Sequence, residues 1–153
     1  MPLLSDQDRK ALEARFRKDV KRDVSMTLYT VRNVGGLILP GRECPTCPQT
    51  EQFLTEVAAA SKHVHLTVKD FYADADAARE HGVERVPCIT LHGEGEESSN
   101  LRFYGIPAGY EVMTLIEDII AAAKGTSPLQ LTTRKALRRL EKPVQLQVFV
   151  TPT

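Results

Sequence analysis

The feature that most constrains the fold is a regular succession of strand-like and helix-like segments between residues 24 and 124. Strand-like segments alternate apolar and polar residues, whereas helix-like segments repeat apolar residues every three or four positions. The predicted strands are Val24–Val31, His63–Phe71, Val86–His92 and Leu101–Tyr104. The predicted helices begin near Pro45 or cover Asp74–His81 and Tyr110–Lys124. A helix between two strands favours a parallel pair and a tight polar turn favours an antiparallel one, so the chain predicts a mixed α/β sheet flanked by helices.

Further segments extend this pattern. An N-terminal helix is predicted over Asp6–Arg22, because a capping serine precedes it and apolar residues recur at helical spacing. A helix over Thr133–Glu141 and a strand over Val144–Val150 are predicted near the other end. Asn33–Glu43 is predicted to be a loop or a short strand, and Gly93–Asn100 a polar turn.

Composition and charge exclude several classes of protein. The 153 residues, 42% hydrophobic and 26% charged, are enough for one compact domain. Twenty basic residues balance twenty acidic ones, which argues against a large cationic surface for nucleic acid. No apolar run approaches the roughly 20 residues that cross a membrane, and no secretory signal is visible. We therefore expect a cytoplasmic protein with no membrane or nucleic-acid partner.

The clearest chemistry is carried by a Cys-x-x-Cys motif, Cys44-Pro45-Thr46-Cys47, which follows an apolar segment and precedes a predicted helix. Unpaired N–H groups and the dipole at a helix N-terminus favour a negatively charged thiolate. We expect Pro45 at the first helical position and Cys47 deeper in the fold. Cys44 is then the attacking thiol and Cys47 the resolving thiol of a disulfide exchange.

Two other interpretations of these cysteines are an inert pair and half of a zinc site. A structural zinc site usually has four ligands, and only Cys88 and the histidines could complete one here. His63 and His65 share one strand face but have no third ligand nearby in the sequence. Cys88 could form an alternative disulfide or help to bind a metal, but a buried free cysteine acting as a small hydrophobe is favoured. We therefore expect a redox pair, no metal and no cofactor.

The order of these motifs resembles the thioredoxin-like superfamily. The resemblance covers most of the chain: the Cys44–Cys47 motif, the strand ending at Phe71, the short helix to Gly82, Pro87 at the start of the next strand, and the hairpin and helix that follow. Within that superfamily, Arg102–Glu111 is similar to the glutaredoxin-like protein disulfide oxidoreductases of archaea and bacteria. The resemblance implies a three-layer fold around a central mixed sheet, with an extra N-terminal helix and strand. It also implies a cis Val86–Pro87 bond and substrate binding at Pro45, Thr46, Val86 and Pro87.

That family contains two such units in tandem, and the sequence hints at a repeat. Arg9-Lys10-Ala11-Leu12 recurs as Arg134-Lys135-Ala136-Leu137. We expect residues 1–126 to form a thioredoxin-like redox unit and residues 127–153 to be the helix and strand that open a second, truncated unit. The last predicted strand has an unpaired edge, and a homodimer formed through it is a hypothesis.

Two departures from the family concern the site. The stretch from Val31 to Arg42 is longer than the usual direct step from strand to cysteine, and its length is expected to affect substrate choice. The buried acid that thioredoxin-like proteins place beneath the resolving cysteine has no assignable counterpart. Asp70, at the end of its strand, is expected to cap the following turn.

Motif and resemblance together predict a thiol–disulfide oxidoreductase that reduces, forms or shuffles protein disulfides. Its expected partners are protein disulfides, with a thioredoxin-reductase-like enzyme or glutathione as candidate electron donors. Two alternatives stay open. One is a redox adapter that passes electrons between a reductase and a dedicated partner such as a peroxidase. The other is a non-catalytic metal or iron–sulfur-binding domain.

Overall fold

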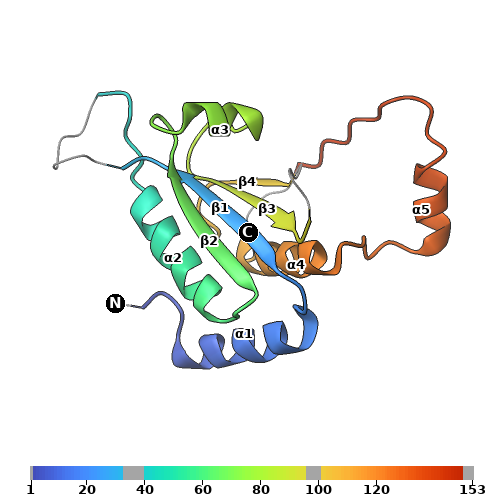
Figure 1. Cartoon of the computed structure of the whole chain (residues 1–153), viewed down its shortest axis with the longest axis horizontal. Coiled ribbons are helices and arrows are strands. Elements are labelled where there is room, and N and C mark those ends of the chain that lie inside the picture. Colours follow the sequence, from blue (N-terminus) through green and yellow to red (C-terminus); the bar gives the residue numbers. More distant parts are fainter. Residues whose placement is uncertain (1, 33–39, 96–100, 150–153) are drawn as a thin grey trace.

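The computed structural model describes residues 2–32, 40–95 and 101–149, which form an α/β fold around a four-stranded sheet (Figure 1). The helices are α1 (Asp6–Asp19), α2 (Cys47–Ala59), α3 (Ala75–Glu80), α4 (Glu111–Lys124) and α5 (Leu131–Leu137). The strands are β1 (Val24–Thr30), β2 (Val64–Asp70), β3 (Cys88–Gly93) and β4 (Arg102–Tyr104). The order strand, helix, strand, helix, strand, strand, helix that the sequence predicts is confirmed from β1 to α4.

The sheet is mixed, as predicted, with the strand order β2-β1-β3-β4. Strand β1 pairs in parallel with β2, with Val24 opposite Val64, and antiparallel with β3, with Tyr29 opposite Cys88. Strand β4 is antiparallel to β3. The carboxyl ends of β1 and β2 and the first residue of β3 therefore lie at the same end of the sheet.

One face of the sheet packs against α1, α2 and α4. Leu28 of β1 and Ile89 of β3 are fully buried there, together with Phe16 of α1, Leu54 of α2 and Ile119 of α4. Burial of a side chain of this size stabilises the fold by roughly 1.5–3 kcal/mol relative to exposure. This contiguous core holds α2, the helix that follows the Cys-x-x-Cys motif, against β1.

Helix α3 covers the opposite face of the sheet, near the carboxyl ends of β1 and β2. Tyr29 and Cys88, which are paired across β1 and β3, pack there with Ala78 of α3 and with Val83. The Tyr29 hydroxyl contacts the carbonyl oxygen of Ala77 at 3.2 Å and Nδ1 of His81 at 2.5 Å. The three layers expected from the sequence, helices, sheet and helix, are thus confirmed.

The N-terminal helix ends earlier than predicted. Helix α1 stops at Asp19 rather than at Arg22, because Val20 takes an extended conformation and is buried. Nε of Arg22 instead donates a hydrogen bond to the carbonyl oxygen of Ala123 at 2.8 Å. That carbonyl is in the last turn of α4, where carbonyl groups have no N–H partner within the helix.

The strand predicted over Val144–Val150 is wrong for residues 144–149, which have no regular structure. Leu146, Val148 and Phe149 are each more than 80% exposed. An isolated strand is not stable without a partner, and no described strand of the sheet pairs with this segment. The preceding helix forms as α5, but it covers Leu131–Leu137 rather than Thr133–Glu141. It buries no residue and lies apart from the sheet (Figure 1).

Parts of three predictions lie outside the described residues. They are residues 33–39 of the predicted loop or short strand over Asn33–Glu43, residues 96–100 of the polar turn, and Val150. Residues 40–43 form no strand, and Gly93 belongs to β3 with a turn at residues 94–95.

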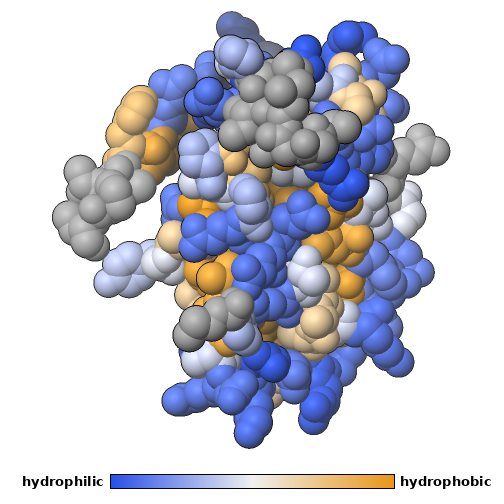
Figure 2. Space-filling view, turned by 90° about the vertical axis from the view of Figure 1, so that its left-hand side faces the viewer, coloured by the Kyte–Doolittle hydropathy of each residue, from blue (hydrophilic) through white to orange (hydrophobic). Residues whose placement is uncertain are grey.

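Charged and polar side chains cover most of the face shown in Figure 2, with hydrophobic side chains visible between them. Among the described residues, none of the helices combines the length and the apolar character that a bilayer crossing requires.

Candidate functional site

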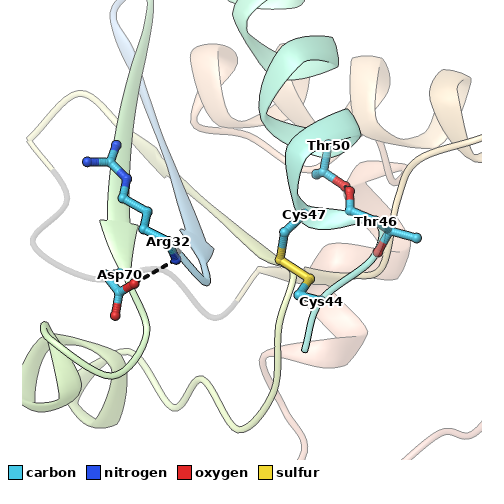
Figure 3. Close-up of a disulfide and its surroundings, with 6 residues drawn as sticks. All are labelled: Arg32, Cys44, Thr46, Cys47, Thr50 and Asp70. Atoms are coloured by element: carbon cyan, nitrogen blue, oxygen red, sulfur yellow. Dashed lines mark hydrogen bonds between the residues drawn. A yellow bond between two sulfur atoms is a disulfide. The ribbon is translucent and has the colours of Figure 1, made fainter. Parts of the chain in front are cut away.

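The candidate site is a disulfide between Cys44 and Cys47 at the start of α2 (Figure 3). Their Cα atoms are 5.3 Å apart, within the usual range for a disulfide. Cys47 is 1% exposed and begins the helix, whereas Cys44 is half-buried in the preceding turn. One sulfur-bearing residue is thus open to solvent and the other is enclosed, which is the asymmetry that the sequence predicts for an attacking and a resolving cysteine.

The start of α2 differs from the prediction. Pro45 does not occupy the first helical position: Thr46 is the N-cap, Cys47 is the first helical residue, and Pro48 lies in the first turn. The N–H of Cys47 donates to the carbonyl oxygen of Cys44 at 3.2 Å, which closes a separate turn ahead of the helix. Pro48 fits the first turn because the N–H it lacks would have no partner within the helix there.

The helix start is electrostatically suited to a thiolate. The first i to i−4 bond runs from the N–H of Thr50 to the carbonyl oxygen of Thr46 at 2.9 Å, and the Thr50 hydroxyl donates to the same oxygen at 2.8 Å. The first turn contains no acidic residue, so no carboxylate there opposes a second negative charge. A thiolate at this end is favoured by the helix dipole.

Val86 and Pro87 lie at the same end of the sheet. The bond between them is cis, as the resemblance implies, and Pro87 immediately precedes the first residue of β3. Pro87 is buried, Val86 is half-buried, and the carbonyl oxygen of Pro87 accepts a hydrogen bond from the N–H of Gly105 at 3.0 Å. Of the other residues expected to bind substrate, Pro45 is exposed and Thr46 is half-buried in the turn beside the disulfide.

Asp70 organises the turn that follows β2, as predicted. One carboxylate oxygen accepts the N–H groups of Tyr72 and Ala73 at 2.9 and 2.8 Å, and the other accepts the N–H of Arg32 at 2.8 Å. Partial burial acts to raise the pKa of Asp70, but the three N–H groups and the positive charge of Arg32 outweigh it and hold the pKa below its ordinary value. Figure 3 shows this link between Asp70, at the end of β2, and Arg32, which follows β1.

Two arginines near the site stack on tyrosine rings. Cζ of Arg42 lies 4.2 Å from the centroid of the Tyr72 ring, and Cζ of Arg85 lies 4.7 Å from that of Tyr104. Both distances are typical of cation–π contacts. Neither pair was predicted, because no pattern in the sequence links either arginine with its tyrosine.

Cys88 is a free, fully buried cysteine on the other face of the sheet. Its neighbours are those of Tyr29 and α3, whereas the core that includes α2 lies on the opposite face. Burial raises the pKa of the Cys88 thiol to about 11, although a hydrogen bond with Tyr104 and the charges of Arg102 and Arg85 act to lower it. This environment supports the interpretation of Cys88 as a small hydrophobe.

The two strand histidines have an acidic partner. Nδ1 of His63 lies 2.8 Å and Nε2 of His65 lies 3.6 Å from Oδ1 of Asp23, which immediately precedes β1. The hydrogen bond from His63 lowers the pKa of the Asp23 carboxyl; burial acts to raise it, and the interactions of His65 lower it further. Across the described part of the chain, no group of three or more histidine, cysteine, aspartate and glutamate side chains is arranged to hold a metal ion.

Comparison with known proteins places this site in a family. A family model for the thioredoxin domain matches residues 37–117, which is more than half of the chain and includes both cysteines and Pro87. The chain belongs to the thioredoxin-domain family. A search of the curated proteins gives no match.

Solved structures agree with this fold. A protein disulfide oxidoreductase from Aeropyrum pernix K1 is 27% identical, with a TM-score of 0.72, and the match covers 89% of this chain and 55% of that one. The alkylhydroperoxide reductase protein AhpF of Enterococcus faecalis is 19% identical, with a TM-score of 0.74, over 91% of this chain and 62% of that one. The isolated NTD_N/C domain of AhpF is 21% identical, with a TM-score of 0.73, over the same shares of the two chains. The chain therefore spans about three fifths or less of the length of these structures.

Proposed function

We propose that this chain is a thiol–disulfide oxidoreductase that exchanges the Cys44–Cys47 disulfide with disulfides of other proteins. The observation that carries the proposal is the pairing of a solvent-accessible Cys44 with a buried Cys47 at the start of α2. The likeness to the Aeropyrum pernix protein disulfide oxidoreductase supports it. The likeness to AhpF supports the fold alone.

The proposed exchange begins from the dithiol. The Cys44 thiolate attacks one sulfur of a substrate disulfide, which breaks the substrate S–S bond, forms a mixed disulfide and releases the first substrate thiolate. The Cys47 thiolate then attacks Sγ of Cys44, so that the Cys44–Cys47 bond forms and the second substrate thiolate leaves. Two electrons pass to the substrate, and the two protons lost by the cysteines balance those gained by the substrate thiols. The reverse sequence oxidises a substrate dithiol.

Substrate binding is proposed for Pro45, Thr46, Val86 and Pro87. Pro45 and Thr46 form the turn beside the disulfide, and Val86 precedes the buried Pro87 at the same end of the sheet. Val86 is half-buried, and we propose that an extended substrate segment pairs with its backbone. A thioredoxin-reductase-like enzyme or glutathione is the proposed electron donor.

A second unit is proposed beyond residue 126. Helix α5 buries none of its side chains, and the apolar residues at positions 144, 146 and 148 are exposed. Such a segment gains stability only when further structure covers it. We propose that residues 1–126 are the redox unit and that residues 127–153 open a second unit of the same kind.

The experiment that tests the redox function measures reduction of insulin disulfides by dithiothreitol. We expect the wild-type chain to accelerate the reaction and Cys44→Ser to abolish the acceleration. Cys47→Ser should accumulate a mixed disulfide with insulin through Cys44, visible by mass spectrometry, because the resolving thiol is missing. Full activity of Cys44→Ser would overturn the assignment, whereas activity only with one cognate protein partner would indicate the adapter function.

A further inference from the structure

Both ends of the segment that leads from β1 to Cys44 contact the same turn after β2. At one end, the N–H of Arg32 donates to the Asp70 carboxylate at 2.8 Å. At the other, the guanidinium of Arg42 lies over the Tyr72 ring at 4.2 Å from its centroid. Arg32, which follows β1, and Arg42, which precedes Cys44 by two residues, thus contact one and the same turn.

That turn is itself held in place. The Asp70 carboxylate accepts the N–H of Tyr72, and the N–H of Phe71 donates to the carbonyl oxygen of Thr30 in β1 at 2.8 Å. The Phe71 and Tyr72 rings meet edge to face with centroids 5.2 Å apart, and Phe71 packs against the buried cluster of Tyr29 and Cys88. Tyr72 is 38% exposed, so one part of its side chain is supported by the fold while another stays at the surface.

Arg42 is exposed, and its guanidinium contacts the Tyr72 ring. In the part of the chain that the structure describes, no carboxylate is within ion-pairing distance of the Arg42 guanidinium. Arg42 precedes Cys44 by two residues, which limits the separation of their Cα atoms to about 7 Å. A restraint on the Arg42 side chain therefore restrains the backbone that carries Cys44.

We propose that Tyr72 is a positioning residue for the redox pair, because its ring holds Arg42 and so keeps Cys44 close to Cys47 when the disulfide opens. The inference rests on the proposed function of the Cys44–Cys47 pair. In the disulfide, the position of Cys44 is set covalently and the stack is well formed. In the dithiol, the covalent link is gone, and the stack adds to the hydrogen bond from the N–H of Cys47 to the carbonyl oxygen of Cys44 in restraining Cys44. The stack and the disulfide therefore stabilise each other reciprocally.

The reaction that reports this coupling is the equilibrium of the protein with glutathione. One protein disulfide and two glutathione thiols give one protein dithiol and one glutathione disulfide, with two electrons and two protons transferred to the protein. We expect Tyr72→Leu, which removes the ring but keeps an apolar side chain, to shift this equilibrium toward the dithiol by about two- to fivefold. That shift corresponds to a reduction potential less negative by about 10–20 mV.

Tyr72→Phe is the matched control, since it keeps the ring and removes only the hydroxyl. We expect its equilibrium constant with glutathione to equal that of the wild type. The free energy of unfolding of both oxidised variants shows whether they are folded before the equilibria are compared. Arg42→Met provides a second route, because it removes the stack from the other side. Arg42→Met also removes a charge near Cys44, so it is compared in the wild type and in the Tyr72→Leu background: the two- to fivefold shift that comes from the stack is expected only where the Tyr72 ring is present.

Each outcome decides the matter. A shift in Tyr72→Leu and Arg42→Met, with none in Tyr72→Phe, supports the positioning role. Wild-type constants in Tyr72→Leu, or an equal shift in Tyr72→Phe, would overturn it while leaving the redox function intact. A wild-type chain whose Cys44 and Cys47 never equilibrate with glutathione would instead remove the proposed function, and this inference with it.

Discussion

The three cysteines lie at one end of the sheet but in two opposite environments. Cys44 and Cys47 are at the start of α2, in a turn with one side open to solvent. Cys88 is on the other face, fully buried beneath α3 and opposite Tyr29. The first environment offers the N-terminal end of a helix, and the second offers apolar side chains.

This contrast shows that surroundings, rather than residue type, assign the chemistry. A helix start with no acidic residue in its first turn favours a thiolate at Cys44. Burial raises the pKa of Cys88 to about 11, which keeps it a neutral thiol at physiological pH. Experiments can test this difference between a redox pair with a half-buried Cys44 and a fully buried Cys88 thiol.

The largest expected effect is on disulfide reduction. Cys44→Ser should lower the rate of insulin reduction by at least about 100-fold, because no other described thiol is both accessible and placed at a helix start. Cys88→Ala, which keeps an apolar side chain in the buried position, should retain activity within about twofold of the wild type. Similar effects of the two substitutions on the initial rate would contradict the different roles assigned to Cys44 and Cys88.

A second test compares the rates of alkylation in the reduced chain. At pH 7.5 an ordinary thiol with a pKa near 8.5 is about 10% thiolate. With its pKa of about 11, Cys88 is almost entirely protonated. Iodoacetamide should therefore modify Cys44 at least about 100-fold faster than Cys88, as measured by peptide mass spectrometry. Equal rates would mean that Cys88 is accessible and that its burial is not maintained in solution.

A third test uses the dependence of stability on pH. The pKa of Cys88 is raised in the folded state, so above the pKa of an unfolded cysteine the folded state binds more protons than the unfolded state. The free energy of unfolding should therefore fall between about pH 9 and pH 11, and fall less in Cys88→Ala. Chemical denaturation of both proteins at each pH isolates this contribution, because other titrating groups are common to the two. Parallel curves would contradict the burial of the thiol.

The smallest expected effect concerns the turn after β2, which the Asp70 carboxylate organises. Asp70→Asn should lower the free energy of unfolding by about 1 kcal/mol, because a neutral amide is a weaker acceptor for the three N–H groups. The pKa of Asp70 is lowered, so its contribution is present above about pH 4 and is lost as the pH falls below that value. The difference between the two proteins should disappear in acid, whereas a constant difference would show that the carboxylate charge is not involved.

Most of the fold could be predicted from the sequence because the strands and helices have strong periodicity. Alternation over Val24–Val31 and the apolar stripe over Tyr110–Lys124 located β1 and α4 to within one residue at each end. The strand over Val144–Val150 was wrong for its described residues, although it alternates equally well. Alternation shows that one face of a segment is apolar, but a strand forms only when a partner strand is present to pair with it.

The parts of the site that depend on a sequence motif could be predicted, whereas the parts that depend on tertiary contacts could not. The spacing of Cys44 and Cys47 indicated the disulfide, and the family resemblance indicated the cis bond before Pro87. The helix start was misplaced, because the sequence offers both Pro45 and Pro48 and only the turn closed by Cys47 decides between them. The stack of Arg42 on Tyr72 joins residues 30 positions apart through the parallel pairing of β1 and β2, which no local pattern encodes.

The most direct test of the account is the redox state of each cysteine after equilibration in glutathione buffers of increasing oxidising strength. Acid quenching, alkylation and peptide mass spectrometry would report all three residues at once. We expect Cys44 and Cys47 to convert together and reversibly from two thiols to one disulfide, while Cys88 stays a thiol at every ratio. A Cys44 and Cys47 that remain thiols throughout, or a disulfide that includes Cys88, would contradict the account.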